Sequence, residues 1–224
     1  MSEFLNQDCL HGMKVYPDNY FDLAIVDPPY FSGPETRKFY GKKVSSIGVK
    51  RVYEQTSEWS VPNKEYFEEL FRVSKNQIIW GVNYFQYEFG PGRIIWDKVN
   101  GESSFSDCEI AFCSVHDSVR LFRYMWNGMF QGESIAEGHI QQGNKKLNEK
   151  RIHPTQKPVN LYRWLIQKYA KDGYKILDTH VGSASSLIAF EEAGLEYVGF
   201  EKDEHIYQSA LTRLDEYKSQ LKLF

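Results

Sequence analysis

The chain has 224 residues, of which 42% are hydrophobic and 25% are charged, and its formal net charge is −3. This length suits one domain with a sizeable core, so we predict a single domain over residues 1–224. The weak negative charge argues against a uniformly basic nucleic-acid binder, and the sequence has neither a bilayer-spanning apolar run nor a signal-peptide pattern. Three cysteines without a CxxC pair indicate a reducing compartment, so we expect a cytoplasmic protein without a membrane partner.

The chain opens with an amphipathic stretch in residues 1–22 that predicts a short helix, and a buried strand follows at residues 23–27. Two prolines directly behind Asp27 stop this apolar strand. Neither proline has an N–H group, so the local carbonyls point outward with little competition. The Asp27 carboxylate, the Pro28 carbonyl and the Tyr30 ring then suit a flat ring with an exocyclic amine. A turn with a capping Asp and a packing Tyr is the alternative.

Residues 31–62 are polar, basic and without periodicity, which predicts a functional or mobile loop. Basic residues gather there and again near residues 145–157, on both flanks of the chemical motifs. We expect phosphate contacts from these groups, with solvated loops as the alternative. The basic residues expected to bind DNA here are Arg37, Lys38, Lys42, Lys43, Lys145 and Lys146.

The middle of the chain alternates a helix with strands. Asn63 is a good cap for a helix over residues 63–74, whose apolar face holds Phe67, Leu70 and Phe71. Strands are expected over residues 77–80, 93–96 and 109–114.

Residues 115–150 contain many Gly, Gln, Asn and Arg residues and few apolar ones after Met129. We interpret this segment as an inserted target-recognition or lid element. Arg120 and Arg123 are candidates for base readout, because Arg suits guanine edges. A solvated insertion is the alternative.

The last third of the chain predicts a nucleotide-binding βαβ unit. After a helix at 159–170 come a strand at 175–178, a small-residue turn, a helix at 185–193 and a strand at 197–200, and a final helix covers 205–217. Glu201 lies 19 positions beyond Gly182, where a carboxylate can accept both hydroxyls of a ribose.

The turn of this unit is not GxGxxG, and Asp178 beside it would repel a pyrophosphate. S-adenosylmethionine carries a sulfonium and an ammonium group and therefore fits better than NAD. A structural βαβ unit with a capping Asp is the alternative. If the strands at 175–178 and 23–27 are neighbours, the Glu201 and Asp27 pockets open onto one crevice, because ligands bind at the carboxyl ends where strand order reverses.

The combined motifs resemble the beta class of amino-methyltransferases that act on DNA, especially the short phage and prophage forms. The resemblance extends over most of the chain apart from roughly 31–55 and 115–150. Two positions depart from the family pattern: Ala184 replaces the last Gly of a Gly-Ser-Gly turn, and Val82 replaces the second of two Gly residues. The matching pieces, in the family's order, are Asp27-Pro28-Pro29-Tyr30, Trp80 to Phe85, Ile95 to Lys98, His153 to Pro158 and Ile176 to Ser186.

The resemblance implies an α/β fold with a doubly wound, mostly parallel sheet, helices on both faces and a circularly permuted motif order. It implies that Asp27 and the Pro28 carbonyl, with Pro29 and Tyr30 completing the catalytic motif, hold an amine for direct attack on the methyl group of S-adenosylmethionine. No covalent intermediate and no metal are needed. Tyr30 would stack on a base flipped out of double-stranded DNA. An Asp at the first motif position usually accompanies adenine N6, so site-specific adenine methylation is expected.

The resemblance also implies a cofactor site. Glu201 would hold the ribose, while Thr155 and Lys157 would approach the cofactor carboxylate. For Asp8 and Cys9, which resemble the adenine-contacting segment, a capped N-terminal turn is the alternative. The full expected set is Asp8, Cys9, Thr155, Lys157, Asp178, Thr179, Gly182, Ser183, Glu201 and Lys202.

Other readings stay open at this point. An N4-cytosine enzyme is the alternative within the class, and a catalytically silent module that binds S-adenosylmethionine or DNA is the alternative outside it. No histidine or cysteine has metal-ligand spacing, so no metal is expected. Because beta-class relatives often dimerise, a homodimer is a further expectation, in a bacterial or phage-infected cell.

Overall fold

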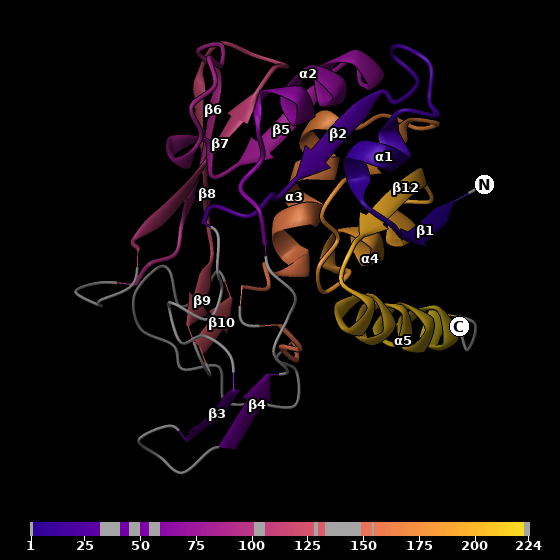
Figure 1. Ribbon diagram of the computed structural model, residues 1–224. Helices are drawn as coiled ribbons and strands as arrows, with labels where there is room; N and C mark the ends of the chain where they lie inside the picture. Colours follow the sequence, from indigo (N-terminus) through magenta and orange to yellow (C-terminus); the bar gives the residue numbers. More distant parts are fainter. Residues whose placement is uncertain are drawn as a thin grey trace.

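An eight-stranded sheet forms the centre of the molecule (Figure 1). The computed structural model describes residues 2–31, 41–44, 50–53, 59–100, 106–127, 130–132, 149–153 and 155–221. In spatial order the strands are β1 (Glu3–Asn6), β12 (Glu196–Glu201), β11 (Lys175–Asp178), β2 (Leu23–Val26), β5 (Gln77–Trp80), β7 (Cys108–Cys113), β6 (Arg93–Asp97) and β8 (Val119–Arg123).

Most neighbouring strands of this sheet are parallel. The run from β1 through β12, β11 and β2 to β5 is parallel throughout, β7 is antiparallel to both its neighbours, and β8 is parallel to β6. From β11 the chain continues to β12 on one side, and from β2 it continues to β5 on the other. Strand order therefore reverses between β11 and β2, which pair directly through Ile176 and Leu23. The predicted doubly wound sheet is confirmed, and the two strands are neighbours, which is the condition for a crevice shared by Glu201 and Asp27.

Helices cover both faces of the sheet, because alternate residues of its buried strands point to opposite sides. Leu23 and Ile25 of β2 face a core formed with α3 (Val159–Tyr169), α4 (Ser185–Glu192) and α5 (Glu204–Leu221). Ala24 and Val26 face a second core formed with α1 (Cys9–Met13) and α2 (Lys64–Val73). In Figure 1, α3 and α4 lie across the sheet from α1 and α2.

The cap predicted for the second helix is present. The Asn63 side chain accepts a hydrogen bond from the backbone N–H of Tyr66 at 3.1 Å and so satisfies one of the free donors at the start of α2. Tyr66, Phe67 and Leu70 form the buried face of this helix. No helix in the described part of the chain is both long and apolar enough to cross a membrane.

Two strands of the main sheet and two hairpins lie where the sequence predicts loops or a helix. β1 precedes the short helix α1, and β8 lies inside segment 115–150, so the beginning of that segment belongs to the sheet and not to an insertion. Both are short edge strands with little buried surface, and in β8 only Phe122 is buried. The hairpins, β3 (Gly41–Val44) with β4 (Lys50–Tyr53) and β9 (Met125–Asn127) with β10 (Phe130–Gly132), lie below the main sheet in Figure 1. A single turn of 3₁₀ helix, η2 (Val82–Tyr84), follows β5.

Candidate active site

One large cavity lies at the carboxyl ends of β2, β11 and β12, at the point where strand order reverses. Its volume is about 1020 Å³, and both Asp27 and Glu201 line it. Ligands of doubly wound sheets bind at this position, and the volume suits a nucleoside-sized ligand together with a second ring. The sequence-based expectation that these two carboxylates share a crevice agrees with this geometry.

The acceptor end of the cavity is organised around Asp27. Its Oδ1 accepts a hydrogen bond from the Tyr30 hydroxyl at 2.6 Å, and its Oδ2 accepts one from Lys157 Nζ at 2.5 Å. The Asp27 side chain is 20% exposed, whereas that of Lys157 is 4% exposed. Burial raises the pKa of Asp27, and the Lys157 charge acts against that rise.

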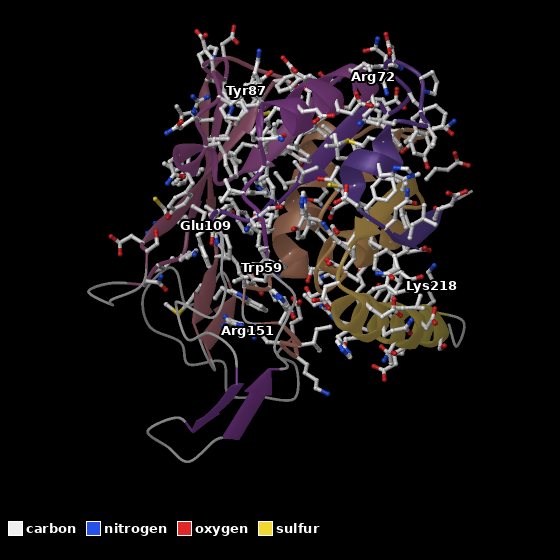
Figure 2. The ribbon with its side chains drawn as sticks, viewed as in Figure 1. Trp59, Arg72, Tyr87, Glu109, Arg151 and Lys218 are labelled. Atoms are coloured by element: carbon white, nitrogen blue, oxygen red, sulfur yellow. The ribbon has the colours of Figure 1, made fainter. Side chains whose placement is uncertain are left out.

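A second carboxylate, Glu109 on β7, lies on the far side of Lys157. Lys157 Nζ lies 2.8 Å from Glu109 Oε2, and Lys98 Nζ lies 2.5 Å from Glu109 Oε1. Burial would raise the pKa of Glu109, but the two lysines outweigh it and hold the pKa at about 2. Burial disfavours the charged form of Lys157, yet Asp27 and Glu109 raise its pKa above the usual value. Glu109 and Trp59, both labelled in Figure 2, line the cavity.

The Tyr30 ring is fixed from two sides. It stacks on Tyr84, with ring centroids 5.0 Å apart and planes 10° from parallel. On another side lies Gly81, which has a φ of +74°. A Cβ atom at Gly81 would lie 1.9 Å from the Tyr30 ring, so this turn requires glycine for its backbone conformation and for space.

The cofactor end is organised around Glu201, the last residue of β12. Its carboxylate accepts hydrogen bonds from the backbone N–H of Gly182 at 3.0 Å and of Asp203 at 2.9 Å. Burial raises the pKa of Glu201 to about 7, although these N–H groups oppose it. Each oxygen keeps a lone pair for a hydroxyl donor, which fits the two hydroxyls of a ribose.

Asp178 takes a different place from the one expected. It is only 1% exposed and does not line the cavity. Its carboxylate accepts hydrogen bonds from Ser186 Oγ at 2.5 Å and from the His180 backbone N–H at 3.0 Å, so it ties the end of β11 to the start of α4. Burial raises its pKa to about 7. This residue supports the turn and does not line the cavity.

The remaining residues expected at the cofactor all line the cavity, in different surroundings. Asp8 caps α1 and pairs with Lys202 at 3.1 Å, so it fulfils the capping alternative while it also borders the cavity. Burial raises the pKa of the Cys9 thiol to about 12. Thr179 Oγ1 lies 2.6 Å from the hydroxyl of Tyr66. Thr155, Gly182 and Ser183 complete this side of the cavity.

The residues expected at DNA are only partly described. Arg120 and Arg123 lie on the exposed edge strand β8, where Arg123 pairs with Asp97 at 3.0 Å. Lys42 and Lys43 belong to β3, for which only the backbone is described. Arg37, Lys38, Lys145 and Lys146 lie outside the described residues.

Sequence reasoning missed Glu109, Tyr66 and Tyr84 as parts of the site. Glu109 carried one signal, because it is a charged residue inside an otherwise apolar strand. Its partner is far away in the chain, and nothing local identifies it. Among the described residues, no three His, Cys, Asp or Glu side chains group so as to hold a metal ion.

Comparison with known proteins places the chain in a family. The N6/N4 methyltransferase family model, described as DNA methylase, matches residues 50–212. The type II methyltransferase M.HinfI of Haemophilus influenzae is 24% identical over 97% of this chain and 70% of its own length. The putative methylase YubD of Escherichia coli (strain K12) is 25% identical over 96% of this chain and 90% of its own length.

Solved structures share the fold. The M1.HpyAVI–SAM complex has a TM-score of 0.55 at 16% identity and covers 95% of this chain and 100% of its own. The putative DNA modification methylase TTHA0409 from Thermus thermophilus, complexed with S-adenosyl-L-methionine, has a TM-score of 0.55 at 13% identity over 97% and 94%. The cytosine-N4-specific PvuII DNA methyltransferase has a TM-score of 0.56 at 13% identity over 97% and 90%.

The matched span of the family model covers most of the chain and includes both strands of the cofactor end, β11 and β12. Members of this family take their methyl group from S-adenosylmethionine. The span begins beyond Asp27, so the role of that residue rests on its geometry. The fold, the shared cavity and the matched model together show that this chain belongs to the N6/N4 family of DNA methylases.

Proposed function

We propose that this chain transfers a methyl group from S-adenosylmethionine to the exocyclic N6 of adenine in double-stranded DNA. The observation that carries the proposal is the single cavity lined by Asp27 at one end and Glu201 at the other. Such a cavity can hold a methyl donor and a methyl acceptor next to each other. Adenine is favoured because an Asp stands at the first position of the Asp27-Pro28-Pro29-Tyr30 motif.

The residues present fit the proposed cofactor. Glu201 offers a carboxylate with free lone pairs at the cavity wall, and Gly182 has a φ of +55° with no heavy atom within 4 Å of an added Cβ, so the backbone leaves room for a ligand. We assign the ribose to Glu201 and the remaining parts to the turn after β11. When bound, S-adenosylmethionine supplies an electrophilic methyl group on a sulfonium.

At the acceptor end, Asp27 and the Pro28 carbonyl would accept the two amine protons and so orient the nitrogen lone pair. The target base has to leave the duplex first, because a stacked base cannot reach a buried carboxylate. With the cofactor held at Glu201, its sulfonium would supply the methyl group to the amine nitrogen and leave as the thioether, and Asp27 would accept the proton that the nitrogen gives up. Arg120 and Arg123 on β8 are the described residues that we assign to DNA contact.

The test is methylation of unmethylated genomic DNA with tritiated cofactor by wild type and Asp27→Ala. We expect the variant to lose at least about 100-fold in rate, the lower end of what a positioned proton acceptor contributes, and to keep its cofactor affinity. Digestion of the product to nucleosides and mass analysis should give N6-methyladenine. N4-methylcytosine would overturn the assignment of the base, and full activity in the variant would overturn the assignment of Asp27. DNA binding by wild type without turnover would show a silent module.

A further inference from the structure

Lys157 lies beside the acceptor carboxylate, and this position differs from the one that its motif suggests. The resemblance of His153 to Pro158 to the family motif implies that Thr155 and Lys157 approach the cofactor carboxylate. Instead, Lys157 Nζ lies 2.5 Å from Asp27 Oδ2, 2.8 Å from Glu109 Oε2 and 3.0 Å from the Tyr30 hydroxyl. An ammonium group has three donors, and these three acceptors use all of them. At 4% exposure, Lys157 has no further donor to offer a cofactor carboxylate.

Four charged side chains alternate in sign along one line. Lys98 contacts Glu109, Glu109 contacts Lys157, and Lys157 contacts Asp27. The two positive and two negative charges compensate each other in a largely buried place, where an isolated charge would be costly. Lys157 therefore lies between two carboxylates: Glu109 fixes its ammonium group on one side, and the same group contacts Asp27 on the other.

This arrangement answers a need of the chemistry. A carboxylate can accept an amine proton only while it is ionised, and burial of Asp27 favours the neutral acid. A nearby ammonium counteracts that preference and also fixes the direction of one carboxylate oxygen. We propose that Lys157, held by Glu109, is a positioning residue that keeps the Asp27 carboxylate ionised and oriented toward the target amine. This inference rests on the proposed function, in which Asp27 receives that amine.

Other titratable groups interact electrostatically with Asp27 from the elements packed around it. They are Tyr30 from its own loop, Glu109 from β7, Asp178 from β11, Tyr66 from α2 and Tyr162 from α3. Burial raises the pKa of all three tyrosines well above the usual value, so they stay neutral through the working range. Asp178 is unchanged in every variant below, so it does not affect the order of their acidic limbs along the pH axis.

The test measures the single-turnover rate of methyl transfer against pH, with enzyme and tritiated cofactor in excess over unmethylated DNA. The cofactor is kept saturating at every pH, so that a change of affinity at Glu201 does not enter, and we assign the acidic limb of this profile to the ionisation of Asp27. Lys157→Met should move the limb to higher pH by about one unit or more, as expected for a buried carboxyl that loses its cation. Lys157→Arg keeps the positive charge, so its acidic limb should lie close to that of wild type. Lys168→Met, which removes an exposed lysine from α3, is the matched control and should leave the limb in place.

Glu109→Gln gives a second test with the opposite sign. Without the Glu109 charge, Asp27 is the only carboxylate that still pairs with Lys157 among its contacts described above. The carboxylate form of Asp27 is then favoured, so the acidic limb should move to lower pH. Damage to the fold does not produce shifts of opposite sign in two contacting residues. If Lys157→Met does not fold by thermal melting, the direction of the Glu109→Gln shift decides, and no shift or an upward shift overturns the proposal.

Two further outcomes overturn the inference or separate it from the proposed function. A Lys157→Met variant with an unmoved limb and a tenfold weaker cofactor affinity would place Lys157 in the cofactor site. If wild type transfers no methyl group, the proposed function fails, and the ionisation of Asp27 is then measured in the protein without DNA by NMR of its carboxyl carbon. An upward shift of that titration in Lys157→Met supports the positioning role, and an identical titration in both proteins overturns it.

Discussion

Two carboxylates at the ends of neighbouring strands, the half-buried Glu201 and the buried Asp178, have similar pKa values and different surroundings. Burial raises the pKa of both Glu201 and Asp178 to about 7. Glu201 faces the cavity, whereas Asp178 faces the start of α4 and is 1% exposed. Both carboxylates accept hydrogen bonds from backbone N–H groups of the same turn. They differ in the direction in which the side chain points. Only Glu201 is placed to sense a bound ligand.

We predict that cofactor affinity depends on the ionisation of Glu201. Below pH 7 the protonated acid loses acceptor capacity for hydroxyl donors, so the affinity for S-adenosylmethionine should rise as pH increases from 6 to 8. Glu201→Gln should bind about tenfold more weakly at pH 8, since a hydrogen bond to a charged group contributes roughly 1.5–3 kcal/mol, and should show no pH dependence. Titration calorimetry measures both quantities.

Asp178→Asn is the control for this prediction, because Asp178 has a similar pKa and lies outside the cavity. It should keep the pH dependence of cofactor affinity. The assignment of Glu201 is wrong if the dependence persists in Glu201→Gln and disappears in Asp178→Asn.

At the scale of elements, the turn between β11 and α4 carries Ala184 where the family usually has glycine. Ala184 is left-handed, with a φ of 62°, and caps α4 without a side-chain hydrogen bond. Its methyl group is fully buried among core residues and does not reach the cavity. The glycine usual in the family suits this backbone better, whereas alanine adds apolar packing.

We therefore predict that Ala184→Gly changes the protein little. Removal of the left-handed alanine should raise the free energy of unfolding by about 1–2 kcal/mol. Loss of the buried methyl group should lower it by about 0.8 kcal/mol, and the greater freedom of glycine in the unfolded chain should lower it by about 0.4–1 kcal/mol. The free energy of unfolding in urea should change by less than about 1 kcal/mol, and cofactor affinity should stay within about twofold. A tenfold change in affinity would show that this position shapes the cofactor pocket after all.

Elements with a continuous apolar run or a clear amphipathic face could be predicted from the sequence. The strands at β2, β5 and β11 and the helix α2 with its Asn63 cap are of this kind. The edge strands β1 and β8 could not be predicted, because they bury few side chains and their sequences therefore show neither an apolar run nor a clear alternation of apolar and polar residues. Their place depends on partners far away in the chain.

The place of Asp27 and Glu201 at one cavity could be predicted, because each of them belongs to a local motif at the end of a strand. The site could not be predicted where two distant side chains meet. Lys157 and Asp27 are 130 positions apart, and the family resemblance implies a place for Lys157 at the cofactor carboxylate instead. Neither sequence spacing nor residue type shows that Glu109 on β7 holds the same lysine.

For the molecule as a whole, buried titratable groups make stability depend on pH in two directions. Burial lowers the pKa of His153 and His180 to about 4, so their neutral forms favour the folded state as pH rises from 4 to 6.5. Burial raises the pKa of Asp178 and Glu201 to about 7. The folded state then binds more protons than the unfolded state, and stability falls as pH rises from about 4 to 7.

A comparison of Asp178→Asn with wild type isolates one of these contributions. Wild type loses stability as Asp178 ionises, and the variant does not, so the free energy of unfolding of the variant relative to wild type should increase with pH. The increase should approach about 1.4 kcal/mol per pH unit between pH 4 and 7 and should level off above pH 7. Urea unfolding at pH 5, 6, 7 and 8 measures it. A difference that is constant with pH would mean that Asp178 is ionised throughout.

The pairing of β1 with β12 has a consequence for how a newly made chain becomes an enzyme. Glu3 lies beside Val198 in the sheet, so β1 waits for its neighbour until most of the polypeptide has left the ribosome. β2 finds β5 much earlier, because Ala24 pairs with Gln77. The nascent protein thus assembles the strand that ends beside Asp27 before it has any place for a methyl donor, and methylation has to wait until β12 has been made.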